Sequence, residues 1–125
     1  MALLSTLPAA DGFAMPAEFA PHRATVLIWP VRPGSWGRDP SAAQNAFLDV
    51  IREIAKGEDV YLLAGAADLA AAQTAAAGIP RVTVFEIESD DAWARDVGPT
   101  FVMDGRTLRG VSWKFNGWGG EVDGL

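Results

Sequence analysis

The sequence predicts an α/β fold in which short buried strands alternate with helices and a β-hairpin follows. Three apolar runs have the length and composition of strands, and the two segments between them have helical features. A further pair of β-rich runs flanks an Asp-Gly turn, the strongest short signal of a hairpin. Half of the 125 residues are hydrophobic, with five tryptophans and six phenylalanines, so the chain can bury a core.

The first strand is expected over residues 24–29, a continuous apolar run before Pro30 that is typical of a strand buried on both faces. Residues 1–23 are expected to form an extended N-terminal segment, since most of them lie in a stretch rich in Pro, Ala and Gly. Residues 30–40 contain three prolines and two glycines and are expected to form a loop.

The first helix is expected to follow this loop and to end at Gly57. Asp39 or Ser41 can cap it, and Ser41 with Gln44 forms a capping-box pattern. Four apolar residues at helical spacing predict its buried face: Phe47, Val50, Ile51 and Ile54.

A second buried strand is expected over residues 60–64 and a third over residues 81–87. Between them, residues 67–77 predict an alanine-rich helix that packs on the sheet without carrying chemistry. Residues 100–103 and 107–113 are expected to pair as the hairpin. No glycine-rich phosphate-binding motif accompanies these elements, which argues against a nucleotide site.

Charge and composition exclude several classes of function. The formal net charge is −6, which argues against nucleic acid or an anionic membrane as a partner. The chain has no cysteine and one histidine, His22, so these residues supply no disulfide, thiol nucleophile or thiolate metal site. The first residues lack the basic region and the apolar length expected of a signal peptide, and no run is near the ~18 apolar residues of a membrane span, so a cytoplasmic location is expected.

The densest group of reactive side chains follows the third strand. Asp90, Asp91 and Asp96 lie within seven residues of sequence, together with Trp93 and Arg95. Loops at the ends of strands are where α/β folds place binding groups. A carboxylate beside an indole suits a planar cation, since the carboxylate accepts paired N–H donors and the ring covers the cation's face.

Residues 114–125 are rich in glycine and aromatic residues, as is typical of loops that line a pocket or cross between strands. Such a stretch would fray at a chain end, so the chain is expected to be a fragment of a longer protein. The alternative is a small domain with a flexible tail.

Four strings occur in order along the chain: MPAEFAPH at residues 15–22, IWPVRPGSW at 28–36, SDDAWARDVGP at 89–99 and WKFNGWGG at 113–120. Each is weak alone, but together they resemble the agmatine deiminase and bacterial peptidylarginine deiminase family in order and spacing. The resemblance covers about the first third of the family's usual length.

This resemblance implies a five-bladed α/β propeller of the pentein type, truncated here, with residues 24–125 supplying about its first two blades. It implies hydrolysis of a guanidinium to a ureido group and ammonia, as in the conversion of agmatine to N-carbamoylputrescine, through a Cys-thiouronium intermediate. The family's catalytic Cys and His lie beyond Leu125, so this chain alone is expected to be inactive. No metal or organic cofactor is implied, and homo-oligomers occur in the family.

By the same resemblance, Asp96 matches the carboxylate that holds the guanidinium and is the candidate catalytic residue; the alternative is an aspartate that caps the following turn. Trp93 is expected either to stack on the substrate or to fill a core. Asn116, Trp118 and Gly119 resemble the family's pocket-rim loop and are expected to contact substrate, or else to form a crossover loop.

Asp90, Asp91 and Arg95 are expected to hold the loop, with Arg95 pairing with Asp90 or Asp91. His22 is expected to be structural. For three large side chains in the second string, the sequence leaves open whether they belong to a site or only pack: Trp29, Arg32 and Trp36.

Two alternatives to an agmatine deiminase stay open. One is a peptidylarginine deiminase of the same family, which the lack of a secretion signal disfavours. The other is a non-catalytic truncated module that binds a cationic ligand or a partner chain, since an incomplete propeller exposes sheet edges.

Overall fold

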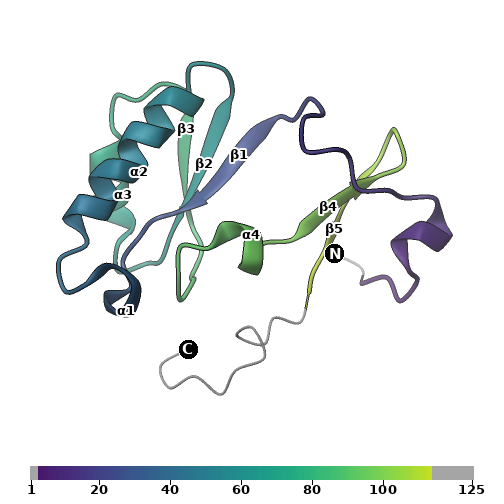
Figure 1. Cartoon of the computed structure of the whole chain (residues 1–125), viewed down its shortest axis with the longest axis horizontal. Coiled ribbons are helices and arrows are strands. Elements are labelled where there is room, and N and C mark those ends of the chain that lie inside the picture. Colours follow the sequence, from purple (N-terminus) through teal and green to yellow (C-terminus); the bar gives the residue numbers. More distant parts are fainter. Residues whose placement is uncertain (1–2, 114–125) are drawn as a thin grey trace. The chain divides into compact units, whose positions relative to one another are not determined.

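The computed structural model describes residues 3–113 of the chain. Residues 22–94 form one compact unit, and residues 3–21 and 95–113 contribute to a second (Figure 1). The organisation expected from the sequence, an extended segment 1–23 followed by a truncated propeller domain 24–125, stays a prediction.

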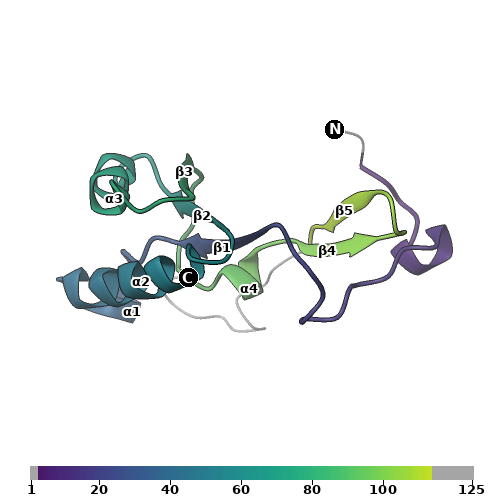
Figure 2. The same cartoon turned by 90° about the horizontal axis from the view of Figure 1, so that it is seen from above.

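The larger unit contains a parallel sheet of three strands in the order β1-β2-β3. Its strands are β1 (Ala24–Ile28), β2 (Asp59–Ala64) and β3 (Val82–Glu86). Helix α2 (Ser41–Ile54) connects β1 to β2, and helix α3 (Leu69–Ala76) connects β2 to β3. In Figure 1 and Figure 2 both helices lie beside the strands that they connect. The alternation of strand and helix predicted by the sequence is confirmed.

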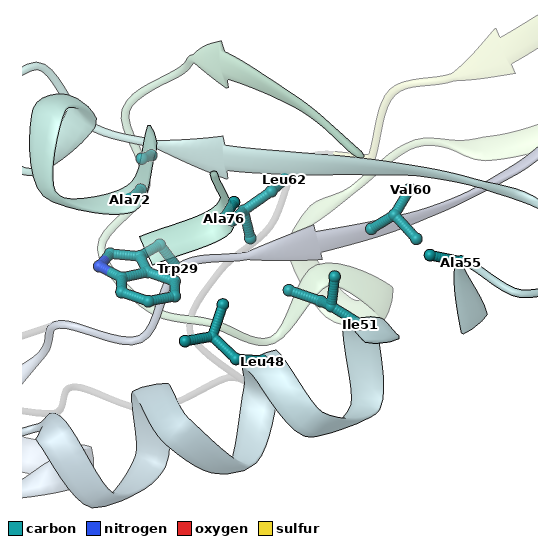
Figure 3. Packing of buried hydrophobic residues seen from close by; sticks show 9 residues of the cluster. Trp29, Leu48, Ile51, Ala55, Val60, Leu62, Ala72 and Ala76 are labelled. Atoms are coloured by element: carbon teal, nitrogen blue, oxygen red, sulfur yellow. The ribbon is translucent and has the colours of Figure 1, made fainter. Parts of the chain in front are cut away.

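The core of this unit lies between the two helices and one face of the sheet. Leu27 of β1 stands opposite Leu62 of β2, which stands opposite Val84 of β3, so these side chains share a face. Helices α2 and α3 pack on that face (Figure 3). The buried cluster consists of Trp29, Leu48, Ile51, Ala55, Val60, Leu62, Ala64, Ala72 and Ala76.

The opposite face of the sheet carries no helix within residues 22–94. Its apolar side chains include Val26 and Phe85, both of which are exposed, and the Phe85 ring packs edge-on against Tyr61 at 5.4 Å between centroids. The expectation that the first strand is buried on both faces is therefore wrong at Val26, whereas Ile28 on the same face is buried.

Helix α2 differs in detail from the sequence prediction. Its buried face is formed by Leu48 and Ile51, and Val50 is 50% exposed, because Val50 points away from the sheet. Asp39 Oδ1 accepts a hydrogen bond from the Ser41 N–H at 3.0 Å, but Asp39 precedes the N-cap residue Pro40, which makes no side-chain cap bond. The capping box does not form, since the Gln44 side chain instead donates to the Pro30 carbonyl at 3.1 Å.

Two short helices occupy segments expected to be loops. Helix α1 (Pro33–Trp36) follows β1, and helix α4 (Ala94–Val97) follows β3. Proline at the first position favours the start of α1, since its fixed φ suits a first helical turn. Gly37, with φ of +78°, ends it in a conformation that side chains rarely adopt.

The second unit contains the predicted hairpin, formed by β4 (Thr100–Met103) and β5 (Leu108–Val111) in antiparallel pairing. In its turn the Asp104 carboxylate accepts hydrogen bonds from the Arg106 and Thr107 N–H groups at 2.9 and 2.7 Å. The N-terminal segment is not wholly extended, since Pro8–Asp11 forms the 3-10 helix η1. Ala14 then bridges Met103 of β4 through two backbone hydrogen bonds.

Between residues 3 and 113, none of the helices has the length and apolar character needed to cross a membrane.

Candidate functional site

In the larger unit, polar and aromatic side chains gather where the parallel strands end. Arg32, Ser35 and Trp36 follow β1, and Asp91 and Trp93 follow β3. The carboxyl ends of parallel strands share one edge of a sheet, so loops far apart in sequence meet there.

Asp91 is the centre of this group and is only 7% exposed. Its Oδ2 accepts hydrogen bonds from Arg32 Nη1 at 3.0 Å and from Ser35 Oγ at 2.7 Å. Its Oδ1 accepts the Ala92 N–H at 2.8 Å, and its backbone carbonyl accepts the Ser89 hydroxyl at 2.8 Å. Both carboxylate oxygens are therefore bound, and the loop after β3 is tied to helix α1.

These donors decide the protonation state of Asp91. Burial acts to raise the pKa of its carboxyl group. The Ser35 hydroxyl, the Ala92 N–H and the Arg32 guanidinium outweigh burial and hold the pKa below its ordinary value. The group is thus an anion at neutral pH, paired with the Arg32 cation.

An aromatic stack lies next to this ion pair. The Trp36 ring packs edge-on against Phe47 of α2, with centroids 5.9 Å apart. Its centroid is 6.0 Å from that of Trp93, with the two ring planes tilted by 34°. Trp93 is 46% exposed, so part of its indole is open to a ligand while Trp36 supports it. An indole of this kind can cover the face of a planar cation.

The predicted pairing of Arg95 with Asp90 or Asp91 is wrong. Arg95 Nη2 instead lies 2.5 Å from Glu18 Oε1 in the second unit, and its side chain is 77% exposed. Arg32 takes the expected place beside Asp91, because it follows the strand whose end shares an edge with β3. Asp90 is exposed.

Asp96 lies in helix α4 and belongs to the second unit, and its side chain is exposed. The predicted contact residues Asn116, Trp118 and Gly119 lie outside the described residues. His22 pairs with Glu58, with Nε2 and Oε2 2.6 Å apart. In the part of the chain that the structure describes, no three His, Cys, Asp or Glu side chains are placed to hold a metal ion.

The second unit carries a groove of about 430 Å³ that includes none of the predicted site residues. Apolar side chains make up much of its lining, among them Leu4, Val102 and Leu108. The charged residues at the groove, Asp11 and Arg109, pair with each other at 2.9 Å. The groove therefore offers no uncompensated charge from this pair to a cationic ligand.

Sequence reasoning missed two polar contributors to the sheet edge. Ser35 lies in a segment that the sequence predicts to be a loop, and its position soon after β1 is the signal that places it near the β3 loop. Glu88 accepts the Ala66 N–H at 2.8 Å. A Cβ atom at Gly65 would lie 2.5 Å from Glu88 Oε2, so the glycine permits this close approach.

Proteins that this chain resembles are described as deiminases of agmatine or of peptidyl-arginine. Residues 14–124 match the sequence model of the Porphyromonas-type peptidyl-arginine deiminase family. The agmatine deiminase of Stutzerimonas stutzeri (strain A1501) is 49% identical over 126 residues, covering 100% of this chain and 34% of the relative. That of Ectopseudomonas mendocina (strain ymp) is 48% identical with the same coverage.

A solved structure, described as agmatine deiminase of Enterococcus faecalis catalysing its reaction, superimposes with a TM-score of 0.89 at 37% identity. The match covers 98% of this chain and 33% of that one. The chain thus spans about a third of the length of the curated relatives that it matches.

Proposed function

The chain belongs to the Porphyromonas-type peptidyl-arginine deiminase family, and on that premise we propose that it is a segment of an agmatine deiminase-like hydrolase. The reaction is hydrolysis of a guanidinium to a ureido group and ammonia, with agmatine giving N-carbamoylputrescine. The observation that carries this proposal is the identity of 48–49% to agmatine deiminases along the whole chain. The enzyme would act in polyamine biosynthesis in the cytoplasm, without a cofactor.

The same relatives support the architecture expected from the sequence. We infer that the two units contribute about the first two blades of a five-bladed propeller, with residues 1–23 leading into residues 24–125. The close superposition on an agmatine deiminase at 37% identity supports this arrangement. Homo-oligomers of the complete protein are part of the same proposal.

In the proposed site, Asp96 holds the guanidinium. A carboxylate can accept two parallel N–H bonds from one guanidinium, which fixes the cation's orientation and stabilises its charge. Trp93 covers the flat face of the cation, and its half-exposed indole supports that role. Asn116, Trp118 and Gly119 complete the rim. Asp90 is proposed to hold the loop with Asp91, whose hydrogen bonds support this role.

The bond-making groups of the proposed reaction are not in this chain. Attack on the guanidinium carbon needs a thiolate, and the chain contains no cysteine. A His from outside the chain would move the protons. Residues of this chain therefore bind and orient the substrate, and the chain alone is expected to release no ammonia from agmatine.

Calorimetric titration of the 125-residue chain with agmatine tests the binding half of the proposal. Agmatine is expected to bind, while putrescine, which lacks the guanidinium, binds more weakly. Asp96→Asn should weaken agmatine binding by about tenfold, since it removes one charge-assisted interaction. Asp49→Asn on the exposed side of α2 is the matched control and should bind as the parent chain does.

Equal agmatine affinity of the Asp96→Asn and parent chains would refute the role of Asp96. Ammonia release by the 125-residue chain at enzyme rates would refute the proposal that the reaction needs a thiolate and a His from outside this chain.

A peptidylarginine deiminase is the second candidate, because the matching family model carries that description. Turnover of agmatine and of an arginine-containing peptide by the complete protein separates the two. A non-catalytic module that binds a cation or a partner chain is the third candidate. It predicts agmatine binding without turnover in every preparation of the complete protein.

A further inference from the structure

We propose that Asp91 is a positioning residue that, through Arg32 and Ser35, fixes the orientation of the Trp93 indole for a planar cation. The proposal rests on the proposed function for the identity of that cation. The orientation of Trp93 by Asp91 can be tested without any ligand.

Asp91 is almost wholly buried and accepts two hydrogen bonds from the α1 region and one from its own loop. The Arg32 side chain is itself largely shielded from solvent. Loss of one partner of such a pair leaves the other charge poorly compensated, so the two segments are held together firmly.

The same two segments also meet through an aromatic contact. Trp36 directly follows Ser35, and Trp93 lies two residues after Asp91. These two indoles pack on each other at 6.0 Å between centroids. Phe47 of α2 contacts Trp36 edge-on, so Trp36 is anchored to a helix whose Ile51 is in the core. A polar contact and an aromatic contact one or two residues apart together fix the tilt of Trp93.

Stacking on a flat cation depends on the direction of the ring face, whereas attraction of a compact ammonium depends mainly on charge. Rotation of Trp93 should therefore weaken guanidinium binding more than ammonium binding. In the complete enzyme it should raise KM with little effect on kcat, because the bond-making groups lie elsewhere.

The orientation of Trp93 can be followed by circular dichroism of the 125-residue chain. Two indoles in contact give an exciton couplet whose sign and size depend on their mutual angle. Trp36→Phe and Trp93→Phe should each remove the same couplet, which assigns it. Asp91→Asn and Ser35→Ala should each reduce it, and Ser35→Thr, which keeps the hydroxyl, should preserve it.

Asp59→Asn is the matched control, because it also removes an aspartate that pairs with an arginine within the larger unit. It should leave the couplet unchanged. A full couplet in folded Asp91→Asn, or in Ser35→Ala if Asp91→Asn does not fold, would overturn the proposal. Equal loss of the couplet in Ser35→Thr and Ser35→Ala would also overturn it, since the hydroxyl would then not matter.

Ligand binding gives the second readout. Agmatine affinity should fall about tenfold in Ser35→Ala, with a smaller change for putrescine. Equal losses for both ligands would contradict the role of ring orientation. If the parent chain binds no agmatine, the proposed function fails for this chain, while the couplet still decides whether Asp91 positions Trp93.

Discussion

Arg32 and Asp91 lie 59 residues apart in the chain, and Nη1 of Arg32 donates to Oδ2 of Asp91 at 3.0 Å. They meet because β1 and β3 run parallel on either side of β2 and end at the same edge. This pair joins helix α1 to the loop that carries Trp93.

The lowered pKa of Asp91 predicts acid sensitivity. A carboxyl group whose pKa is lower in the folded than in the unfolded state stabilises the fold above its unfolded pKa, about 4 for aspartate. That stabilisation is lost as the pH falls through the folded pKa. In urea titrations, the free energy of unfolding of the parent chain should therefore fall as the pH drops below about 4. Asp91→Asn should make this free energy less dependent on pH. Parallel pH curves for the two proteins would contradict this.

Arg32 and Arg95 should differ sharply in their contribution to stability. Arg32→Ala removes a charged hydrogen bond from a buried carboxylate and should lower the free energy of unfolding by about 2 kcal/mol. Arg95→Ala breaks a pair between two exposed side chains and should change it by less than about 0.5 kcal/mol. Urea titrations of both variants measure these changes. Similar losses of unfolding free energy in the two variants would contradict the difference in burial between the two ion pairs.

The buried face of α2 predicts an asymmetry between neighbours. Ile51→Ala opens a cavity in the core of the larger unit and should cost about 3 kcal/mol. Val50→Ala, one position earlier on an exposed site, should change stability by less than about 0.5 kcal/mol. Urea unfolding followed by far-ultraviolet circular dichroism measures both. A loss of stability in Val50→Ala as large as that in Ile51→Ala would instead support the buried helix face predicted from the sequence, which includes Val50.

The hairpin turn depends on a glycine with positive φ. Gly105 has φ of +91°, so Gly105→Ala should destabilise the hairpin by more than about 1 kcal/mol. Gly57→Ala is the control, because Gly57 has no positive φ and a Cβ there would meet only ordinary contacts. Hydrogen exchange of the β4 and β5 amides should accelerate in the first variant alone. Equal rates in both would exclude strain at Gly105.

Much of the fold could be predicted because its signals are local. The apolar runs at β1, β2 and β3, the glycine and proline residues between elements and the Asp104-Gly105 turn each act over a few residues. The exposed position of Val50 could not be read in this way, because two helix faces of similar apolar spacing compete. The contact of α2 with the sheet selected Leu48 in place of Val50.

At the candidate site, the order of residues along the chain is enough to place acidic and aromatic side chains after the third strand and to show the resemblance to the deiminase family. Tertiary structure alone decided that Arg32 and not Arg95 binds Asp91, and that Trp36 supports Trp93. The reason is physical: the partner of a buried charge depends on strand order and on which loops share a sheet edge. Neighbours along the chain do not determine that edge, whereas parallel pairing of β1, β2 and β3 does.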